Sequence, residues 1–244
     1  MALPVFYIPF YSPDQQELQL DEDNSRHAIQ VLRMRPGEAL RLTDGKGALL
    51  DAVIVDDHKK KCRVAIKNST TETPRTNKVT IAISPVKNTA RFEWFLEKAT
   101  EIGVSTIVPL VCERTERQSI RTDRLRNILV SAMLQSQQTW LPNLTEPTPF
   151  AGLLAQVAGL PAQAPASQAY IAHLLDAPRA TDSLAAVAKA GATESLILIG
   201  PEGDFTPKEV EAALAARFTP VSLGQNRLRT ETAGIVAATL LCIH

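Results

Sequence analysis

The chain has 244 residues, of which 45% are hydrophobic and 21% charged, and its formal net charge at pH 7 is zero. This composition argues against a disordered chain, and no apolar run approaches the roughly 20 residues that span a membrane. A net charge of zero also argues against a protein that coats nucleic acid indiscriminately by neutralising its phosphates. Any RNA binding is therefore expected to be local.

Neither the N-terminus nor the cysteines indicate secretion or metal binding. The first residues, MALPVFYIPFYSP, lack a basic leader and a helical apolar core, so we expect no signal peptide and a cytoplasmic location. Cys62, Cys112 and Cys242 lie far apart without a C-x-x-C motif, and the four histidines are scattered. These positions predict neither a disulfide framework nor a metal site.

Residues 1–70 are predicted to form a β module with one helix. Short strands are expected at residues 4–8, 40–43, 48–55 and 62–67, with a hairpin turn at Asp44-Gly45-Lys46-Gly47. The helix is expected at residues 24–33, where Arg26, His27 and Arg33, with Arg35 just beyond, form a basic cluster. The cluster could be a solvated helix end or an RNA contact, and composition alone favours the first.

A polar segment separates this module from the rest of the chain. Residues 68–78, NSTTETPRTNK, are threonine-rich and interrupted by Pro74, which is typical of a linker. We place the linker at residues 71–78 and a second domain at residues 79–244. There, strands predicted at 79–83, 106–111, 170–174 and 196–199 alternate with helices at 91–102, 122–137 and 183–190, which predicts a parallel sheet.

The C-terminal fifty residues contain two units of strand, loop and helix. The first strand ends at Gly200-Pro201, and Thr206, Pro207 and Glu209 fit the N-cap, the first position and the capping box of a helix reaching about Ala216. The second unit has a strand at 220–223, a loop at 224–229 and an apolar helix at 233–241, capped by Thr230 or Thr232. Such loops often bind ligands, although spacing alone fits a purely structural role equally well.

These two loops resemble the signature of a known family. GPEGDFTPKEV (residues 200–210) and LGQNRLRTETAG (residues 223–234) closely resemble the paired signature of the RsmE family of ribosomal RNA small-subunit methyltransferases. The resemblance extends in order over nearly the whole chain, through HAIQVLRMRPGE (27–38), EKATEIGVSTIVPLVCERTER (97–117) and SAMLQSQQTWLP (131–142). Asp204 departs from it where many members have a second glycine, and Asn226-Arg227 replaces a commoner pair.

The resemblance implies an α/β fold of the SPOUT superfamily. This fold has a parallel sheet with a C-terminal trefoil knot that binds S-adenosylmethionine, here preceded by a PUA-like β-barrel that binds RNA. The knot is expected only through the resemblance, because knots are nearly absent from proteins. A homodimer with the helix at 233–241 in its interface is also implied. The implied reaction is methylation of a uridine at N3 in 16S rRNA of the small ribosomal subunit.

The resemblance implies that both loops contact the cofactor, largely through backbone groups. Glycine lets a backbone approach a ligand closely, so added bulk at Gly200 or Gly224 is expected to impair binding. Side-chain changes at Leu223 and Leu228 are expected to be tolerated. The predicted cofactor-binding residues are Leu198, Ile199, Gly200, Glu202, Gly203, Leu223, Gly224, Leu228, Arg229, Thr232 and Ala233.

Arg229, Glu231 and Arg114 are the catalytic candidates. Arg229 could stabilise a uracil anion, while Glu231 could accept a proton or simply be an acid in the first turn of a helix. Residues 113–126 contain five arginines and three acids, which fits a solvated surface of weak ion pairs or a substrate clamp. We predict RNA contacts by Arg26, His27, Arg33, Arg35, Arg114 and Arg117.

Two other functions remain open from the sequence. A related SPOUT enzyme could methylate another RNA base or a ribose, and a non-catalytic RNA-binding assembly factor could keep the fold without turnover. The N-terminal module joined to GPEGDF and RLRTETAG favours the uracil-N3 enzyme over the first alternative. Intact signature loops argue against the second, and a measurement of cofactor binding would separate the two cases.

Overall fold

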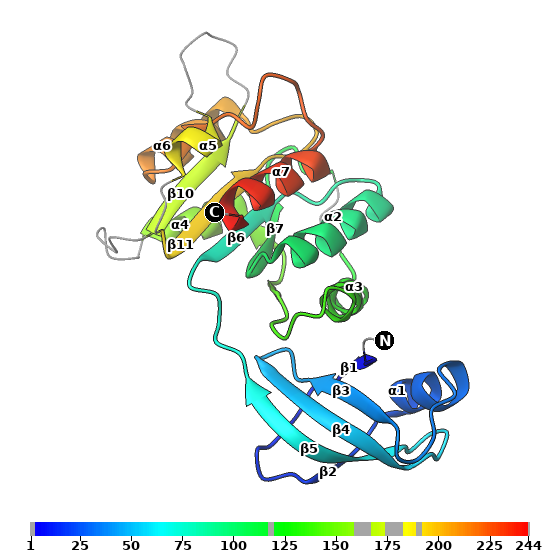
Figure 1. Cartoon of the computed structure of the whole chain (residues 1–244). Helices are drawn as coiled ribbons and strands as arrows, with labels where there is room; N and C mark the ends of the chain where they lie inside the picture. The colour runs from blue at the N-terminus through cyan, green and yellow to red at the C-terminus, as the bar shows by residue number, and fades with distance from the viewer. Residues whose placement is uncertain (1–2, 117–119, 159–166, 174–182, 189–191, 244) are drawn as a thin grey trace. The chain divides into compact units, whose positions relative to one another are not determined.

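The computed structural model describes residues 3–116, 120–158, 167–173, 183–188 and 192–243. Its backbone divides into two compact units (Figure 1). The first comprises Met1–Pro74 together with Met133–Leu141, and the second comprises Arg75–Ala132 together with Pro142–His244. Each unit contains a buried apolar cluster of its own.

The first unit is built on a five-stranded sheet in the order β1-β3-β4-β5-β2. β1 pairs with β3 in parallel, and the remaining pairs are antiparallel. Alternate side chains of β4, including Leu50, Ala52 and Ile54, are buried in the core, as expected for a strand with one face covered. The strands are β1 (Val5–Tyr7), β2 (Glu17–Gln19), β3 (Ala39–Thr43), β4 (Ala48–Asp56) and β5 (Arg63–Thr71).

The hairpin turn predicted between β3 and β4 is confirmed. Asp44 accepts hydrogen bonds from the backbone N–H groups of Lys46 and Ala48, at 2.7 and 3.1 Å. Gly45 and Gly47 adopt φ angles of 69° and 99°, in the left-handed region that glycine enters without strain. The turn residues therefore form the local structure that their sequence indicates.

A segment that comes much later in the chain covers this turn. A Cβ atom on Gly47 would lie 2.5 Å from the ring of Trp140 and 2.8 Å from the carbonyl of Glu72. The Gly47 N–H donates to the Thr139 carbonyl at 3.0 Å, and the Thr139 hydroxyl donates to the Glu72 carboxylate at 2.7 Å. Met133–Leu141 thus completes the first unit, which the sequence did not indicate.

The helix predicted at residues 24–33 begins earlier and changes its form. α1 (Glu22–Arg26) follows Asp21, whose side chain accepts from the backbone N–H of Asn24 at 2.8 Å. An aspartate at this position satisfies one of the free N–H groups at a helix start, which explains the earlier beginning. A π-helix, η1 (His27–Val31), comes next, and Arg33 lies beyond it at φ 58°.

The expected linker is only partly without regular structure. β5 continues to Thr71, so residues 68–71 belong to a strand rather than to a connection. Residues 72–77 contain no helix or strand, and β6 begins at Lys78. Residues 69–71 were read as part of a linker because they are polar, whereas β5 needs only backbone pairing with β4 there.

The second unit contains the predicted parallel sheet. Its strands follow the order β12-β10-β11-β6-β7-β8, with β9 also paired to β7, and each of these described pairs is parallel. The strands are β6 (Lys78–Ile83), β7 (Thr106–Val111), β8 (Asn143–Leu144), β9 (Thr148–Pro149), β10 (Ser167–Ala172), β11 (Glu194–Ile199) and β12 (Thr219–Val221). The prediction at 170–174 ran past Ala172, and residue 174 lies outside the described residues.

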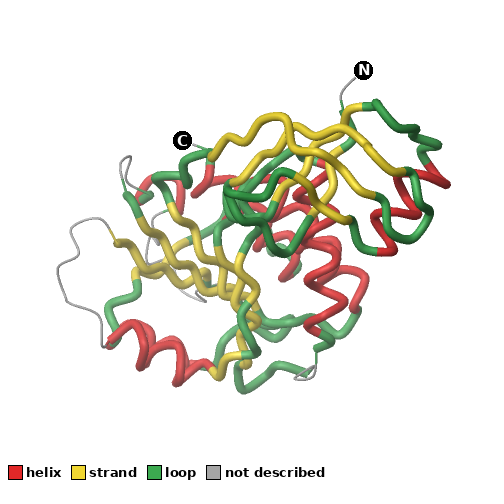
Figure 2. The backbone as a smooth tube through the Cα atoms, turned by 90° about the horizontal axis from the view of Figure 1, so that it is seen from below, coloured by secondary structure: helices red, strands yellow, loops and turns green. Residues whose placement is uncertain are grey.

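Helices lie on both sides of these strands (Figure 2). On one face α4 and α6 pack against inward side chains such as Ala82 and Leu198. On the other face α7 contacts α2, β6 and β11. The helices are α2 (Thr89–Ile102), α3 (Thr122–Gln135), α4 (Phe150–Ala158), α5 (Leu184–Val187), α6 (Pro207–Ala215) and α7 (Thr230–Cys242). The helix predicted at 183–190 corresponds to α5, and its residues 189–190 lie outside the described residues.

α7 approaches the sheet closely at one glycine. A Cβ atom on Gly234 would lie 2.6 Å from Cε2 of Phe95 in α2 and 2.8 Å from Cδ1 of Ile83 in β6. Both side chains are buried in the core, so neither has room to move aside. Close packing of interiors makes such positions intolerant of added atoms.

The two C-terminal helices begin differently. α6 has the predicted capping box: the Thr206 hydroxyl accepts from the Glu209 N–H, and the Glu209 carboxylate accepts from the Thr206 N–H at 2.8 Å. α7 begins at Thr230 with Arg229 at the N-cap position and no side-chain cap bond. The predicted cap by Thr230 or Thr232 is therefore wrong, because Thr230 is already helical and its hydroxyl donates to the Gly200 carbonyl at 3.1 Å.

We predict that Glu209→Ala destabilises the second unit. Glu209 is 8% exposed, and its second carboxylate oxygen accepts from the backbone N–H of Glu113 at 2.8 Å. Removing the carboxylate leaves two N–H groups without their acceptor, which should lower the free energy of unfolding by about 1–3 kcal/mol. Urea denaturation followed by circular dichroism measures this. Glu211→Ala, at an exposed position of α6, is the control, and equal stability of the two variants would contradict the prediction.

Candidate active site

A cavity of about 480 Å³ lies at the carboxyl ends of β10, β11 and β12. This is the edge at which open parallel sheets bind ligands, and the volume lies within the range of roughly 300–1,000 Å³ typical of small-molecule sites. The loops after these three strands supply its walls, together with Arg91 from the first turn of α2 and Ala233 from α7. The two signature loops therefore lie beside each other around one space.

Most of the predicted cofactor-binding residues line this cavity. Eight do so: Ile199, Gly200, Glu202, Leu223, Gly224, Leu228, Arg229 and Ala233. Leu198, Gly203 and Thr232 do not. Leu198 points into the core against α4 and α6, because successive residues of a strand face opposite sides. The roles of all eleven residues in cofactor binding stay predictions.

Several cavity residues were not predicted from the sequence. Ala172 and His173 come directly after β10, so the rule that ligands bind at carboxyl ends of strands could have found them. Asp204 lies in the first signature loop, where its departure from glycine was noted, whereas Arg91 carried no comparable signal in the sequence. The unpredicted lining residues are Arg91, Ala172, His173, Pro201, Asp204, Val221, Ser222, Asn226, Arg227 and Thr230.

The first loop is held in a tight turn. Asp204 donates its N–H to the Pro201 carbonyl at 2.9 Å and adopts φ 61°. A Cβ atom on Gly200 would lie 3.1 Å from the ring of Phe205, which is 2% exposed. Gly224 differs, because no atom lies within 4 Å of its Cβ position, although φ is 134°. Crowding therefore constrains Gly200, whereas backbone conformation constrains Gly224.

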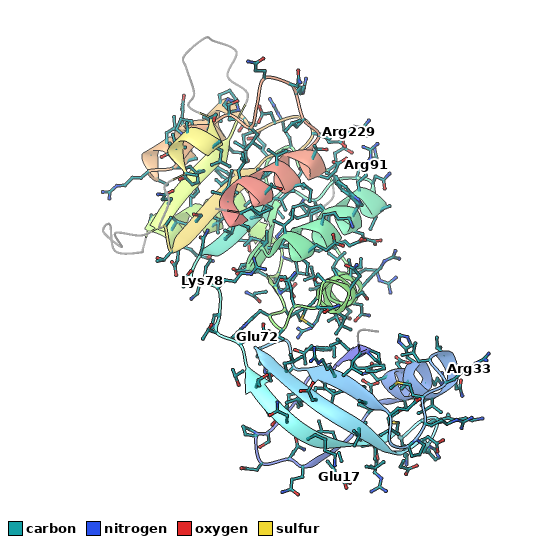
Figure 3. All side chains as sticks on the ribbon, viewed as in Figure 1. Glu17, Arg33, Glu72, Lys78, Arg91 and Arg229 are labelled. Carbon is teal, nitrogen blue, oxygen red and sulfur yellow. The ribbon has the colours of Figure 1, made fainter. Side chains whose placement is uncertain are left out.

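Arg91 connects two acids around the cavity. Its Nε lies 3.7 Å from Glu231 Oε1, and its Nη1 lies 3.9 Å from Glu202 Oε1. Figure 3 shows Arg91 and Arg229 at the same end of α2 and α7. The Glu231 side chain is only 7% exposed, and its Oε2 has no hydrogen-bond partner among the described residues. Glu231 is thus more than a solvated acid in a first helical turn.

The predicted arginine candidates occupy three different places. Arg229 lines the cavity, whereas Arg114 donates from Nη1 to the Gly203 carbonyl and so joins the loop after β7 to the loop after β11. Arg114 is exposed, but it does not line the cavity. Arg117 lies outside the described residues.

The predicted RNA-binding cluster of the first unit is partly engaged in local contacts. Arg26 forms an ion pair with Glu22, and Arg35 Nη1 lies 3.3 Å from Asp57 Oδ2. The ring of His27 contacts Phe6 edge-on, with 5.7 Å between ring centroids. Arg26 and Arg35 still have side-chain exposures of 50% and 74%, so both remain accessible to a ligand.

Cysteine chemistry is not available near the cavity. Cys112 follows β7, and burial, reinforced by the charge of Glu209, raises the pKa of its thiol to about 12. The thiol is therefore protonated at neutral pH and is not a nucleophile. Among the described residues, no group of three or more His, Cys, Asp or Glu side chains is placed to hold a metal ion. No described helix has the length and apolar character needed to cross a membrane.

Family models match both units of the chain. Residues 72–242 match the RNA methyltransferase domain, and residues 20–67 match the RNA methyltransferase PUA domain. Because the first match covers more than half of the chain, the protein belongs to the class of RNA methyltransferases. The PUA match also falls on the unit that carries Arg26, His27, Arg33 and Arg35.

Individual relatives narrow this class. The chain is 32% identical over 218 residues to ribosomal RNA small subunit methyltransferase E of a Synechocystis species, covering 86% of this chain and 68% of the relative. The chain therefore belongs to the ribosomal RNA small subunit methyltransferase E family. A solved member from Neisseria gonorrhoeae, bound to S-adenosyl methionine, is 27% identical with a TM-score of 0.83, covering 97% of this chain and 95% of that one.

A second solved structure is similar over almost its whole length. It is described as a probable rRNA-methyltransferase from Porphyromonas gingivalis, with 42% identity and a TM-score of 0.87. The match covers 98% of each chain. Both units of this protein are therefore shared with a solved relative.

We predict that Gly200→Val weakens the binding of S-adenosylmethionine by about tenfold or more. A branched side chain here would displace Phe205 and the turn that it anchors, and overpacking of this kind costs about 1–3 kcal/mol. Isothermal titration calorimetry measures the affinity. Gly152→Val is the matched control, because the nearest atom to its Cβ position is 3.9 Å away. Wild-type affinity in the Gly200 variant would contradict the prediction.

Proposed function

We propose that this protein transfers a methyl group from S-adenosylmethionine to N3 of a uridine in the 16S rRNA of the small ribosomal subunit. Membership of the family makes it an rRNA methyltransferase that uses this cofactor. The observation that carries the proposal is the single cavity formed by both signature loops at the carboxyl edge of the sheet. Choice of uracil N3 is supported by the resemblance of these loops to the RsmE signature.

The cavity has the chemistry that the cofactor requires. Glu202 and Asp204 provide carboxylates, and Arg227 and Arg229 provide guanidinium groups, which suits a ligand carrying an ammonium, a carboxylate and a sulfonium. Gly200 and Gly224 leave backbone groups uncovered by side chains. When bound, the cofactor supplies a methyl group that its sulfonium has already activated for transfer.

The protein contributes mainly through alignment and electrostatics. Holding two reactants in line can be worth an effective concentration of roughly 10⁵–10⁸ M, so few catalytic side chains are needed. We assign Arg229, in the cavity wall, to stabilising negative charge on the uracil ring during transfer. Glu231 keeps Arg91 at the cavity, and Arg114 contacts the RNA beside the first loop.

We extend this proposal to the RNA contacts, the knot and the dimer interface outside the cavity. We place the RNA contacts of the first unit at Arg26, His27, Arg33 and Arg35, and a further one at Arg117. A trefoil knot is supported by the path of the chain: after β12 at the sheet edge it returns to α7, which contacts β6 and β11, and Thr230 bonds to the Gly200 carbonyl. The apolar α7 suits a homodimer interface, and the substrate implies a cytoplasmic enzyme.

We predict that the protein forms N3-methyluridine in small ribosomal subunits that lack this modification. Labelled methyl transfer from S-adenosylmethionine, followed by nucleoside mass spectrometry, identifies the product. Subunits that already carry the modification are the control and should take up no label. Detection of a ribose-methylated nucleoside would contradict the proposal and indicate the activity of a related methyltransferase. Cofactor binding without any product would favour a non-catalytic assembly factor.

Replacing Arg229 by alanine should lower kcat by about a hundredfold. The loss of one preorganised donor to a developing anion typically costs about 10²–10³ in rate. Single-turnover kinetics measure the methyl-transfer step, and calorimetry shows whether cofactor binding changes. Lys208→Ala, at an exposed position of α6 outside the cavity, is the control. A kcat equal to that of the control would remove Arg229 from the mechanism.

A further inference from the structure

His173 and Asp204 form a hydrogen-bonded pair in the wall of the cavity. The His173 Nδ1 atom lies 3.0 Å from Asp204 Oδ2, and their side chains are only 16% and 24% exposed. His173 directly follows β10, and Asp204 lies in the loop after β11. Because β10 and β11 are parallel neighbours in register, their carboxyl ends place the two residues side by side.

Asp204 is held firmly in this position. Its Oδ1 accepts from the Phe205 N–H at 2.7 Å, while Oδ2 faces the imidazole. Its φ of 61° is left-handed, a conformation that glycine adopts freely and that aspartate can adopt when its side chain bonds locally, as Oδ1 does here. The carboxylate is thereby fixed with Oδ2 toward His173.

The pair fixes which imidazole nitrogen can accept a proton. An ionised carboxylate accepts hydrogen bonds but donates none, so the hydrogen between the two residues belongs to Nδ1 of His173. In a neutral imidazole, Nε2 then carries the free lone pair. A buried aspartate beside a histidine has the same orienting effect in serine hydrolases, where it also stabilises the imidazolium that forms.

His173 is the only imidazole among the described residues that line the cavity. The cations facing the same space are Arg91 from α2 and Arg227 and Arg229 from the loop before α7, and guanidinium groups do not accept protons. Glu202 and Asp204, from the loop after β11, are the carboxylates of the lining, and Asp204 is already engaged with His173 and the Phe205 N–H. Glu231 is not in the cavity lining, and its nearest charged partner is Arg91.

We propose that His173, oriented by Asp204, is the catalytic base that removes the N3 proton of the target uridine. The inference rests on the proposed function and adds the proton acceptor to it. The N3–H proton moves to Nε2 of His173, and the nitrogen electron pair forms a bond to the methyl carbon. The carbon–sulfur bond breaks with its electrons on sulfur, giving S-adenosylhomocysteine, N3-methyluridine and an imidazolium that loses its proton to water.

The test compares His173→Gln with wild type in single-turnover methyl transfer. We expect kcat to fall by about 10²-fold, the lower end of the range for a general base, while affinity for S-adenosylmethionine changes less than about threefold, which is under 1 kcal/mol. The wild-type rate should fall as the pH is lowered, because a protonated imidazole cannot accept the proton. In His173→Gln the rate should instead rise with hydroxide concentration over the whole pH range, because N3 must then lose its proton to solvent. His58→Gln, exposed in the first unit, is the control.

Asp204→Gly tests the role of the carboxylate in a variant whose backbone can adopt the same φ angle. Glycine adopts the same φ without strain and keeps the backbone bond to the Pro201 carbonyl, while the partner of His173 and the acceptor of the Phe205 N–H are removed. We expect a smaller loss of kcat than in His173→Gln, with the acid limb of the wild-type pH profile still present. A His173→Gln enzyme with kcat within about threefold of wild type, or one whose whole defect is lost cofactor affinity, would overturn the inference. Absence of N3-methyluridine from the wild-type reaction would instead overturn the proposed function.

Discussion

The hydrogen bond from the Thr230 hydroxyl to the Gly200 carbonyl joins the two loops that form the cavity. These loops follow β11 and β12, which are not neighbours, because β10 lies between them in the sheet. The bond therefore closes the space above the carboxyl end of β10, where His173 lies. It also ties the first residue of α7 to the first signature loop, so the start of this helix and the shape of the cavity are set together.

The position of α7 determines the electrostatics of the site. Gly234 lets this helix lie against Phe95 and Ile83, which brings Glu231 within reach of Arg91 on α2. Arg91 in turn faces Glu202 in the loop after β11. Opposite charges thus connect three elements around the cavity, and burial of Glu231 leaves its pair with Arg91 less screened by salt than a surface pair is. The position of α7 therefore determines both the apolar packing at Gly234 and the placement of Glu231 beside Arg91.

Local signals in the sequence were enough to predict most of the second unit, and tertiary contacts explain what they missed. The capping box of α6 depends on residues three positions apart, so pattern alone found it. The start of α7 was misplaced because the Thr230 hydroxyl bonds to a residue thirty positions earlier. Arg91 and the pairing of His173 with Asp204 were missed because sheet order, which has no local signature, brings them together.

The contact between Gly47 and Trp140 has a consequence for synthesis on the ribosome. The turn between β3 and β4 is covered by Thr139 and Trp140, which emerge long after β5 is complete. Domains usually fold in the order in which they are made, N-terminal first. Here the N-terminal unit cannot bury this turn until Arg75–Ala132 of the second unit has been translated. The first unit can therefore complete its folding only after part of the methyltransferase unit has been synthesised. The two units do not fold strictly one after the other.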